Sequence, residues 1–268
     1  MLQPTQSKNP TSPIPQIGKT LGLAALLLAG MGAIVQLQQP KLKSLRHSDP
    51  NGRDYQREEL REEVRVNLLK NIPAFGFENL LANWAMLQFI QYYGDGEARE
   101  VTGYRLSPNY LEAIVNNDPR FSRAYLIISP ASSINAGRPD LTIGAMNRGL
   151  KHLGPDIPDA YYVWLYKGID ELLFLGDIPE AKKSYTMAGD WAAQAGNDFI
   201  ASTTKDTVKF LDSNPDSRTA QVGAWFLIYV NVPDAETKAF AKENIERLGG
   251  KLVFGENGLV KAVPPQKD

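Results

Sequence analysis

The stretch that most constrains how this chain folds runs from Asp159 to Ala188, where two helices are predicted on either side of a tight turn. Gly176 and Asp177 suit that turn, and Pro179 suits the first turn of the second helix. Small residues alternate with large ones, so we expect the two helices to approach closely with interlocking side chains. One hairpin cannot cover all of its own apolar surface. The sequence therefore predicts similar hairpins stacked on both sides.

The spacing of large and small residues in this hairpin follows a repeat pattern. The positions that define it are Trp164, Gly168, Leu172, Gly176, Asp177, Ala181, Tyr185 and Ala188. With these residues the segment resembles a tetratricopeptide repeat (TPR), in which large residues and a small one on the first helix precede a Gly-Asp turn, and Ala, an aromatic residue and Ala follow on the second. The first half fits only if one extra residue stands before the turn. The resemblance implies an all-α array of helical hairpins, an α-solenoid.

Two weaker copies of the pattern precede this hairpin. In the nearer copy, Tyr125 stands on the first helix, and Met146 and Gly149 stand on the second. In the farther copy, Trp84 and Tyr110 hold comparable places. The predicted TPR-like helical domain covers residues 54–250 and ends in one more helical pair. Residues 251–268 are predicted to form a small β-hairpin and a tail, because short apolar runs flank a turn-forming Gly-Glu-Asn-Gly sequence.

The first helices of this domain differ in character. Tyr55 to Lys70 is dense in alternating Arg and Glu, which predicts a helix with a solvent-exposed charged face. Phe77 to Tyr93 is apolar nearly all round, which predicts a buried helix.

The amino-terminal part of the chain divides into three segments. Residues 1–18 are rich in Pro, Gln, Ser and Thr and are predicted to form a disordered tail. Residues 19–38 include an uncharged, largely apolar run that begins after Lys19, which predicts a single transmembrane anchor in a plasma or thylakoid membrane; a cleaved signal peptide and a buried helix are the alternatives. Residues 39–53 form a polar linker. The short basic tail before the apolar run slightly favours a non-cytosolic helical domain.

Composition excludes several classes of function. Lys and Arg number 29 against 30 Asp and Glu, so a net charge of -1 gives no field that would hold nucleic acid. The absence of Cys excludes disulfides, thiolate metal sites and cysteine nucleophiles. The two His residues are far apart in sequence, and no phosphate-binding, zinc or calcium motif is complete. We therefore expect neither a cofactor nor a metal site.

Asp170 and Glu171 are the one pair of adjacent carboxylates considered as a catalytic pair. Neighbouring residues on a helix point about 100° apart, so these two side chains are not expected to converge on one bond as a general acid and base. The sequence favours a protein that is not an enzyme. A hydrolytic enzyme using this pair is the weaker alternative.

The surface expected to carry function is the concave groove that the TPR resemblance implies, lined by the first helix of each hairpin. The candidate groove residues are Tyr162, Tyr166, Asp170, Gln88, Gln91, Arg123 and Tyr125. Aromatic and Arg side chains are common anchors of interfaces. The alternative is that Tyr162 and Tyr166 simply pack against the next hairpin.

The apolar anchor, the FENLLANWAMLQFIQYYGD stretch, the Asp-Pro-Arg-Phe turn and the Gly-Asp hairpin together resemble membrane-anchored TPR proteins of photosynthetic bacteria. This resemblance covers roughly residues 20–250 and implies a scaffold or assembly factor, one that serves photosynthetic membrane complexes. Its partners would be other proteins, through a peptide segment or a helix of a membrane complex. A stable accessory subunit of such a complex is the alternative.

Overall fold

The computed structural model describes residues 22, 29–36, 39, 53–255 and 258–265, and the chain divides into two units, Met1–Asp54 and Tyr55–Asp268. In the first unit, residues 29–36 are helical. The predicted tail 1–18 lies outside the described residues, as do most of the predicted anchor 19–38 and nearly all of the linker 39–53. Within the described part of the chain, no helix is both long enough and apolar enough to cross a membrane.

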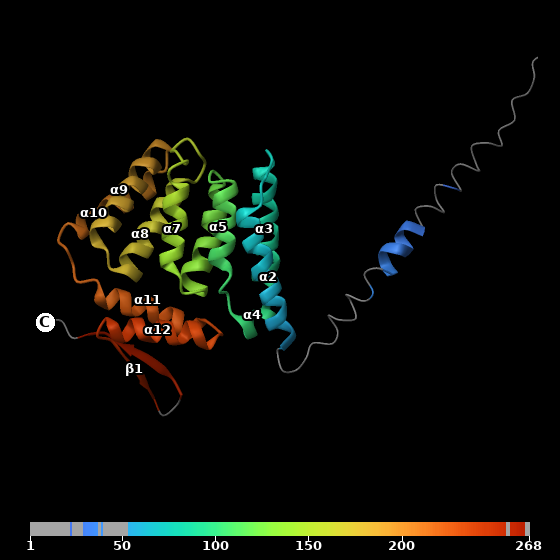
Figure 1. Ribbon diagram of the computed structural model, residues 1–268. Helices are drawn as coiled ribbons and strands as arrows, with labels where there is room; N and C mark the ends of the chain where they lie inside the picture. The colour runs from blue at the N-terminus through green and yellow to red at the C-terminus, as the bar shows by residue number, and fades with distance from the viewer. Residues whose placement is uncertain (1–21, 23–28, 37–38, 40–52, 256–257, 266–268) are drawn as a thin grey trace, which may run out of the picture. The chain divides into compact units, whose positions relative to one another are not determined.

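The second unit is mostly helical, as predicted. Its helices are α2 (Arg53–Asn71), α3 (Glu78–Gly94), α4 (Gly96–Thr102), α5 (Ser107–Asn117), α6 (Ser122–Pro130), α7 (Pro139–Gly149), α8 (Tyr161–Asp170), α9 (Ile178–Gln194), α10 (Asp198–Leu211), α11 (Arg218–Asn231) and α12 (Ala235–Arg247). Two π-helical turns, η1 (Ala131–Asn135) and η2 (Glu171–Leu175), continue α6 and α8. Figure 1 shows α3, α5, α7, α8 and α9 side by side, with α11 and α12 running across one end of them.

The hairpin predicted around Gly176 is present as α8 with η2, followed by α9. Gly176 ends η2 in the left-handed conformation at φ +67°, and the side chain of Asp177 caps α9 by accepting a hydrogen bond of 3.1 Å from the backbone N–H of Glu180. A Cβ added to Gly168 would lie 3.3 Å from atoms of Ser184 and Tyr185, so α8 and α9 approach closely at this glycine.

The other repeat-defining residues of this hairpin fill the space beside Gly168. Ala181 and Ala188 are fully buried, Tyr185 is buried, and Leu172 is half-buried against the same cluster. The Trp164 ring meets the Trp191 ring edge to face, with 6.0 Å between centroids. These contacts agree with the predicted interlock of large and small side chains.

The π-helical turn η2 accommodates the extra residue that precedes the Gly-Asp turn. In η2 the N–H of Gly176 reaches back to the carbonyl of Glu171, five residues earlier, so this turn holds one residue more than an α-helical turn. The preceding hairpin has the same feature: Pro130 is followed by η1, where the N–H of Ala136 donates to the carbonyl of Ala131 at 3.0 Å. Both first helices therefore end in a π turn beside α11, which packs against η1 and η2.

Close helix packing also occurs within the preceding hairpin, between α6 and α7. Tyr125 of α6 lies directly against Gly149 of α7, where any Cβ would overlap the tyrosine ring. The main hydrophobic core runs from α2 through α9, and a second core lies between η2, α11 and α12. The predicted C-terminal hairpin is confirmed: β1 (Lys251–Phe254) pairs antiparallel with β2 (Val260–Val263), with Lys251 opposite Val263.

Candidate functional site

An apolar surface lies exposed on α2, α3 and the loop between them, and we call it the α2–α3 face. Along each helix its residues recur three or four positions apart, so they form one stripe per helix. Each is between 49% and 87% exposed: Leu60, Val64, Leu68, Ile72, Phe75, Phe77, Leu80, Trp84, Leu87 and Ile90. The opposite sides of the same helices enter the core, through Val66 on α2 and through Ala82 and Phe89 on α3.

Polar contacts fix the orientation in which α2 presents this face. Tyr110 of α5 donates a hydrogen bond to Glu62, and Nη1 of Arg65 lies 3.2 Å from Oε1 of Gln88 on α3. At the end of the helix, Nζ of Lys70 lies 2.8 Å from Oε2 of Glu112. A helix held on its inner side by such contacts cannot turn its apolar stripe inward.

The apolar character of this face is unusual for its place in the fold. Helical arrays generally end in an element with a polar outer side, because nothing stacks on that side. Large exposed apolar patches on soluble domains mark sites of protein or membrane interaction. The α2–α3 face is therefore the strongest candidate interaction surface in the described part of the chain.

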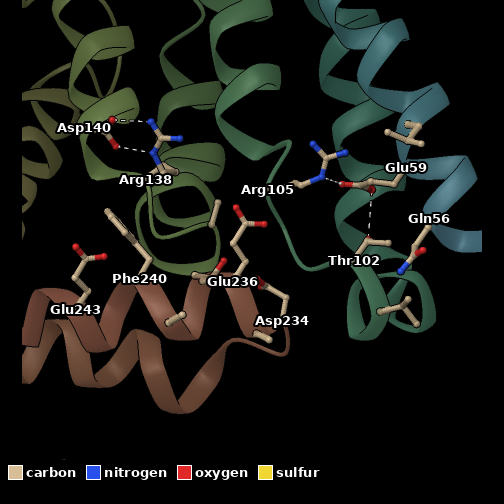
Figure 2. Close-up of a pocket in the computed structure, with 16 residues that line it drawn as sticks. Gln56, Glu59, Thr102, Arg105, Arg138, Asp140, Asp234, Glu236, Phe240 and Glu243 are labelled. Carbon is tan, nitrogen blue, oxygen red and sulfur yellow. Dashed lines mark hydrogen bonds and ion pairs between the residues drawn. The ribbon is translucent and has the colours of Figure 1, made fainter.

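A polar cleft of about 1050 Å³ adjoins this face through Leu60, which belongs to both. Its walls come from α2, the end of α4, the start of α7 and α12, and Figure 2 shows Arg105 and Glu59 on one side and Phe240 and Glu243 on the other. Val101 and Phe240 add exposed apolar patches to the cleft.

Carboxylates outnumber cations in the lining of this cleft. Glu59 is buried, with its Oε2 3.1 Å from Nη1 of Arg99 and its Oε1 3.4 Å from Nε of Arg105. Arg138 holds Asp140 through two hydrogen bonds of 2.9 and 2.7 Å, which lower the pKa of that carboxyl. The lining carboxylates are Glu59, Asp140, Asp234, Glu236 and Glu243, and the lining guanidiniums are Arg105 and Arg138.

The surplus negative charge lies on α12. Asp234 caps this helix by accepting a 2.8 Å hydrogen bond from the N–H of Thr237 through Oδ1, while its Oδ2 is buried and makes no hydrogen bond to any described residue. Glu236 and Glu243 are exposed along the cleft. The cleft therefore suits a ligand that brings positive charge together with some apolar surface.

The structure scatters the candidate groove residues. Gln88 is buried under Arg65 of α2, and Tyr125 is fully buried with its hydroxyl donating to the carbonyl of Pro119 at 2.9 Å, so neither is open to a partner. Gln91 and Arg123 are exposed. Side chains of α2 lie over Gln88, and α11 packs against the π turns that follow α6 and α8.

The remaining candidates lie close together. The Tyr162 ring packs on the rings of Tyr161 and Tyr166 of the same helix α8, with centroids 4.5 and 6.3 Å apart. Tyr162 and Tyr166 are half-buried against the main core. Tyr166 and Asp170 line a separate small pocket beside α11.

Asp170 and Glu171 have separate partners. The Ser133 hydroxyl donates to Asp170 at 2.5 Å, whereas Glu171 pairs with Lys167 and accepts a 2.6 Å hydrogen bond from the Ser184 hydroxyl. The two carboxyls thus face different neighbours, as the helical geometry predicts. Across the described residues, no group of three His, Asp or Glu side chains is placed to hold a metal ion.

Sequence reasoning missed the α2–α3 face for identifiable reasons. The prediction that Phe77–Tyr93 is buried all round is wrong, because Leu80, Trp84 and Leu87 face outward. In the α2 sequence, apolar residues recur every four positions from Leu60 to Ile72, but they stand among many Arg and Glu residues, so their pattern is easily overlooked. That spacing was the signal that could have identified the stripe.

The chain matches no protein-family model, and no curated protein or solved structure shows significant similarity to it. The tetratricopeptide resemblance therefore remains a prediction drawn from the residues themselves.

Proposed function

We propose that this chain is a non-enzymatic, TPR-like scaffold or assembly factor, tethered by residues 19–38, that binds a protein of a membrane complex of the kind found in photosynthetic membranes. The observation that carries the proposal is the α2–α3 face, one stripe of large exposed apolar side chains on each of two helices at one end of the helical array (Figure 1). Covering such a surface with another apolar surface is favourable in water, and large exposed apolar patches mark interaction sites.

The occupant we propose for this face is an apolar helix of a partner protein. A lipid surface would favour a cationic rim around the apolar stripe. On α2, however, Arg61 and Arg65 alternate with Glu58 and Glu62, so the rim has no net positive charge. Two apolar stripes on neighbouring helices suit a third helix laid along them, which is a common mode of helix recognition.

The tether limits where the partner is found. A fully extended linker over residues 39–53 spans at most roughly 50 Å, so a domain anchored through residues 19–38 stays close to the bilayer. The partner is then a protein with an apolar segment at or near the membrane surface. The partner's segment would extend beyond the α2–α3 face at Leu60 and into the acidic cleft. There its Lys or Arg side chains would complement Glu236 and Glu243.

Two alternatives differ in what they require. A stable accessory subunit uses the same face and differs from a scaffold only in the lifetime of the complex. A hydrolytic enzyme would need Asp170 and Glu171 to act on one bond, and their different hydrogen-bond partners argue against it.

The test compares two double variants of the tagged, full-length chain purified from solubilised membranes. Leu80→Lys with Trp84→Glu changes the α2–α3 face, and Phe199→Lys with Phe210→Glu makes the same kind of change on α10, where both side chains are also exposed. We expect a discrete membrane complex to co-purify with the wild type and the α10 variant and to be lost with the face variant. A photo-crosslinking residue at position 84 should attach to an apolar segment of the same partner.

The other occupants give distinct results. Crosslinks at position 84 that join two copies of the chain, or only lipid, would overturn the proposal. So would recovery of the same complex with the face variant. Turnover of a small molecule by the purified chain, lost on Asp170→Asn or Glu171→Gln, would favour the enzyme.

A further inference from the structure

A second pocket, separate from the α2–α3 face and the acidic cleft, lies where α11 packs against the two π turns. Its volume is about 490 Å³, within the range of roughly 300–1,000 Å³ that holds small organic ligands. Its walls are mainly apolar and come from three directions: Pro130 and Ile134 around η1, Ile169, Leu173 and Phe174 on α8 and η2, and Ala220, Ala224 and Leu227 on α11. We call it the Asp170 pocket.

One carboxyl group lies at the wall of this apolar pocket. Asp170 is 6% exposed, and it accepts a hydrogen bond from the Ser133 hydroxyl at 2.5 Å. It makes no ion pair with any residue that the structure describes; the nearby Lys167 pairs with Glu171. A buried carboxylate without a cation is costly, and a ligand that supplies the cation removes that cost.

A second polar group in the pocket also lacks a partner. The hydroxyl of Ser129 is buried, lines the pocket and makes no hydrogen bond to any described residue. Unsatisfied buried polar atoms are rare in folded proteins and call for an explanation. Asp170 and Ser129 thus place a charged group and an unpaired hydroxyl among the residues that line a mainly apolar space.

The backbone around the pocket is irregular on the same side. Asp170 ends α8 where η2 begins, and Ser133 lies within η1. Single π turns inside helices are frequent at functional sites. On the opposite wall, Gly223 has no heavy atom within 4 Å of where a Cβ would lie, so the missing side chain leaves open space at the pocket rim.

From this arrangement we propose that the Asp170 pocket binds a small organic amine, with its ammonium group on the Asp170 carboxylate, a hydrogen bond to the Ser129 hydroxyl, and an apolar body against Ile169, Leu173 and Leu227. The site is distinct from the protein-binding face, and the proposal does not depend on it.

The test measures binding of three probes to the full-length chain by titration calorimetry: n-octylamine, 1-octanol and octanoate. They share the same apolar body and differ in charge at the head group. We expect octylamine to bind at least tenfold more tightly than octanol, because only the amine gains an ion pair, and we expect octanoate not to bind. Equal affinities for all three would mean that only apolar contact is measured and would overturn the proposal.

Three variants show whether the binding occurs in this pocket. Asp170→Asn keeps the shape of the side chain and should weaken octylamine binding at least tenfold while leaving octanol unchanged. Gly223→Leu fills the open space on α11 and should weaken both probes. Gly144→Leu is the matched control, since Gly144 on α7 also has nothing within 4 Å and does not line the pocket. Unchanged octylamine binding by both pocket variants would place the amine elsewhere and refute the assignment.

Discussion

At the scale of single residues, Asp170 shows how burial changes the chemistry of a side chain. The pKa of Asp170 is raised from 3.8 to about 7, mainly by burial and to a smaller extent by the neighbouring Glu171, while the hydrogen bond from the Ser133 hydroxyl lowers it. Burial, together with the nearby Asp170 and Glu171 carboxyls, raises the pKa of Tyr185 on α9 to about 12. The amino-acid sequence shows that two carboxylates are adjacent, and only their surroundings make one of them titrate near neutral pH.

The raised pKa predicts how stability depends on pH. Between about pH 4 and pH 7, folded Asp170 keeps a proton that the unfolded chain has lost, so its contribution to stability is greatest below that window and is lost as the pH rises through it. Asp170→Asn cannot ionise. Its free energy of unfolding should therefore exceed that of the wild type by roughly 2–4 kcal/mol at pH 8, which means a more stable protein. The difference should be smaller at pH 4.5.

Urea unfolding of both proteins at the two pH values measures this difference. Glu171 and Tyr185 are present in both proteins, so the comparison isolates Asp170. A difference between variant and wild type that is the same at pH 4.5 and pH 8 would show that Asp170 does not titrate between these values.

At the scale of elements, pairs of large and small residues decide how closely helices approach. Gly149 of α7 leaves room for the ring of Tyr125, and Gly168 of α8 leaves room for Tyr185. These contacts explain why the pattern pairs a glycine with a large residue, because a side chain at the glycine position would hold the two helices apart. The π turns η1 and η2 add a second feature, of which the sequence indicated only η2, as one residue too many before the Gly-Asp turn.

Two glycines on α7 separate packing from helix propensity. Gly149→Ala places a methyl group against the buried Tyr125 ring and should lower the unfolding free energy by roughly 1–3 kcal/mol. Gly144→Ala meets no atom within 4 Å and should raise it by up to about 1 kcal/mol, because Ala favours a helix more than Gly does. Thermal unfolding followed by circular dichroism gives both values. Equal shifts for the two variants would show that α6 and α7 are not closely packed at Gly149.

At the scale of the whole molecule, the second unit contains its own hydrophobic cores. The core residues between Val66 and Leu248 come entirely from within Tyr55–Asp268. Both surfaces proposed here for binding lie on this second unit.

A chain shortened to residues 55–268 tests this division. It should unfold cooperatively with a midpoint within a few degrees of the full-length chain, because it keeps all core contacts. Its exposed α2–α3 face should promote self-association in the absence of a partner, and Leu80→Lys with Trp84→Glu should reduce that association in sedimentation experiments. A shortened chain that shows no cooperative transition would mean that residues 1–54 are part of the fold.

The sequence by itself determined the features that depend on residues close together in the chain. These are the helical class, the Gly176 turn with its Asp177 cap, the close approach at Gly168 and the C-terminal hairpin, all of which follow from local spacing, turn residues and side-chain size. Only the tertiary structure decided which apolar faces are covered. Periodicity shows that a helix face is apolar but not what lies against it, so neither the packing of α11 on η1 and η2 nor the open side of α2 and α3 could be read from the sequence.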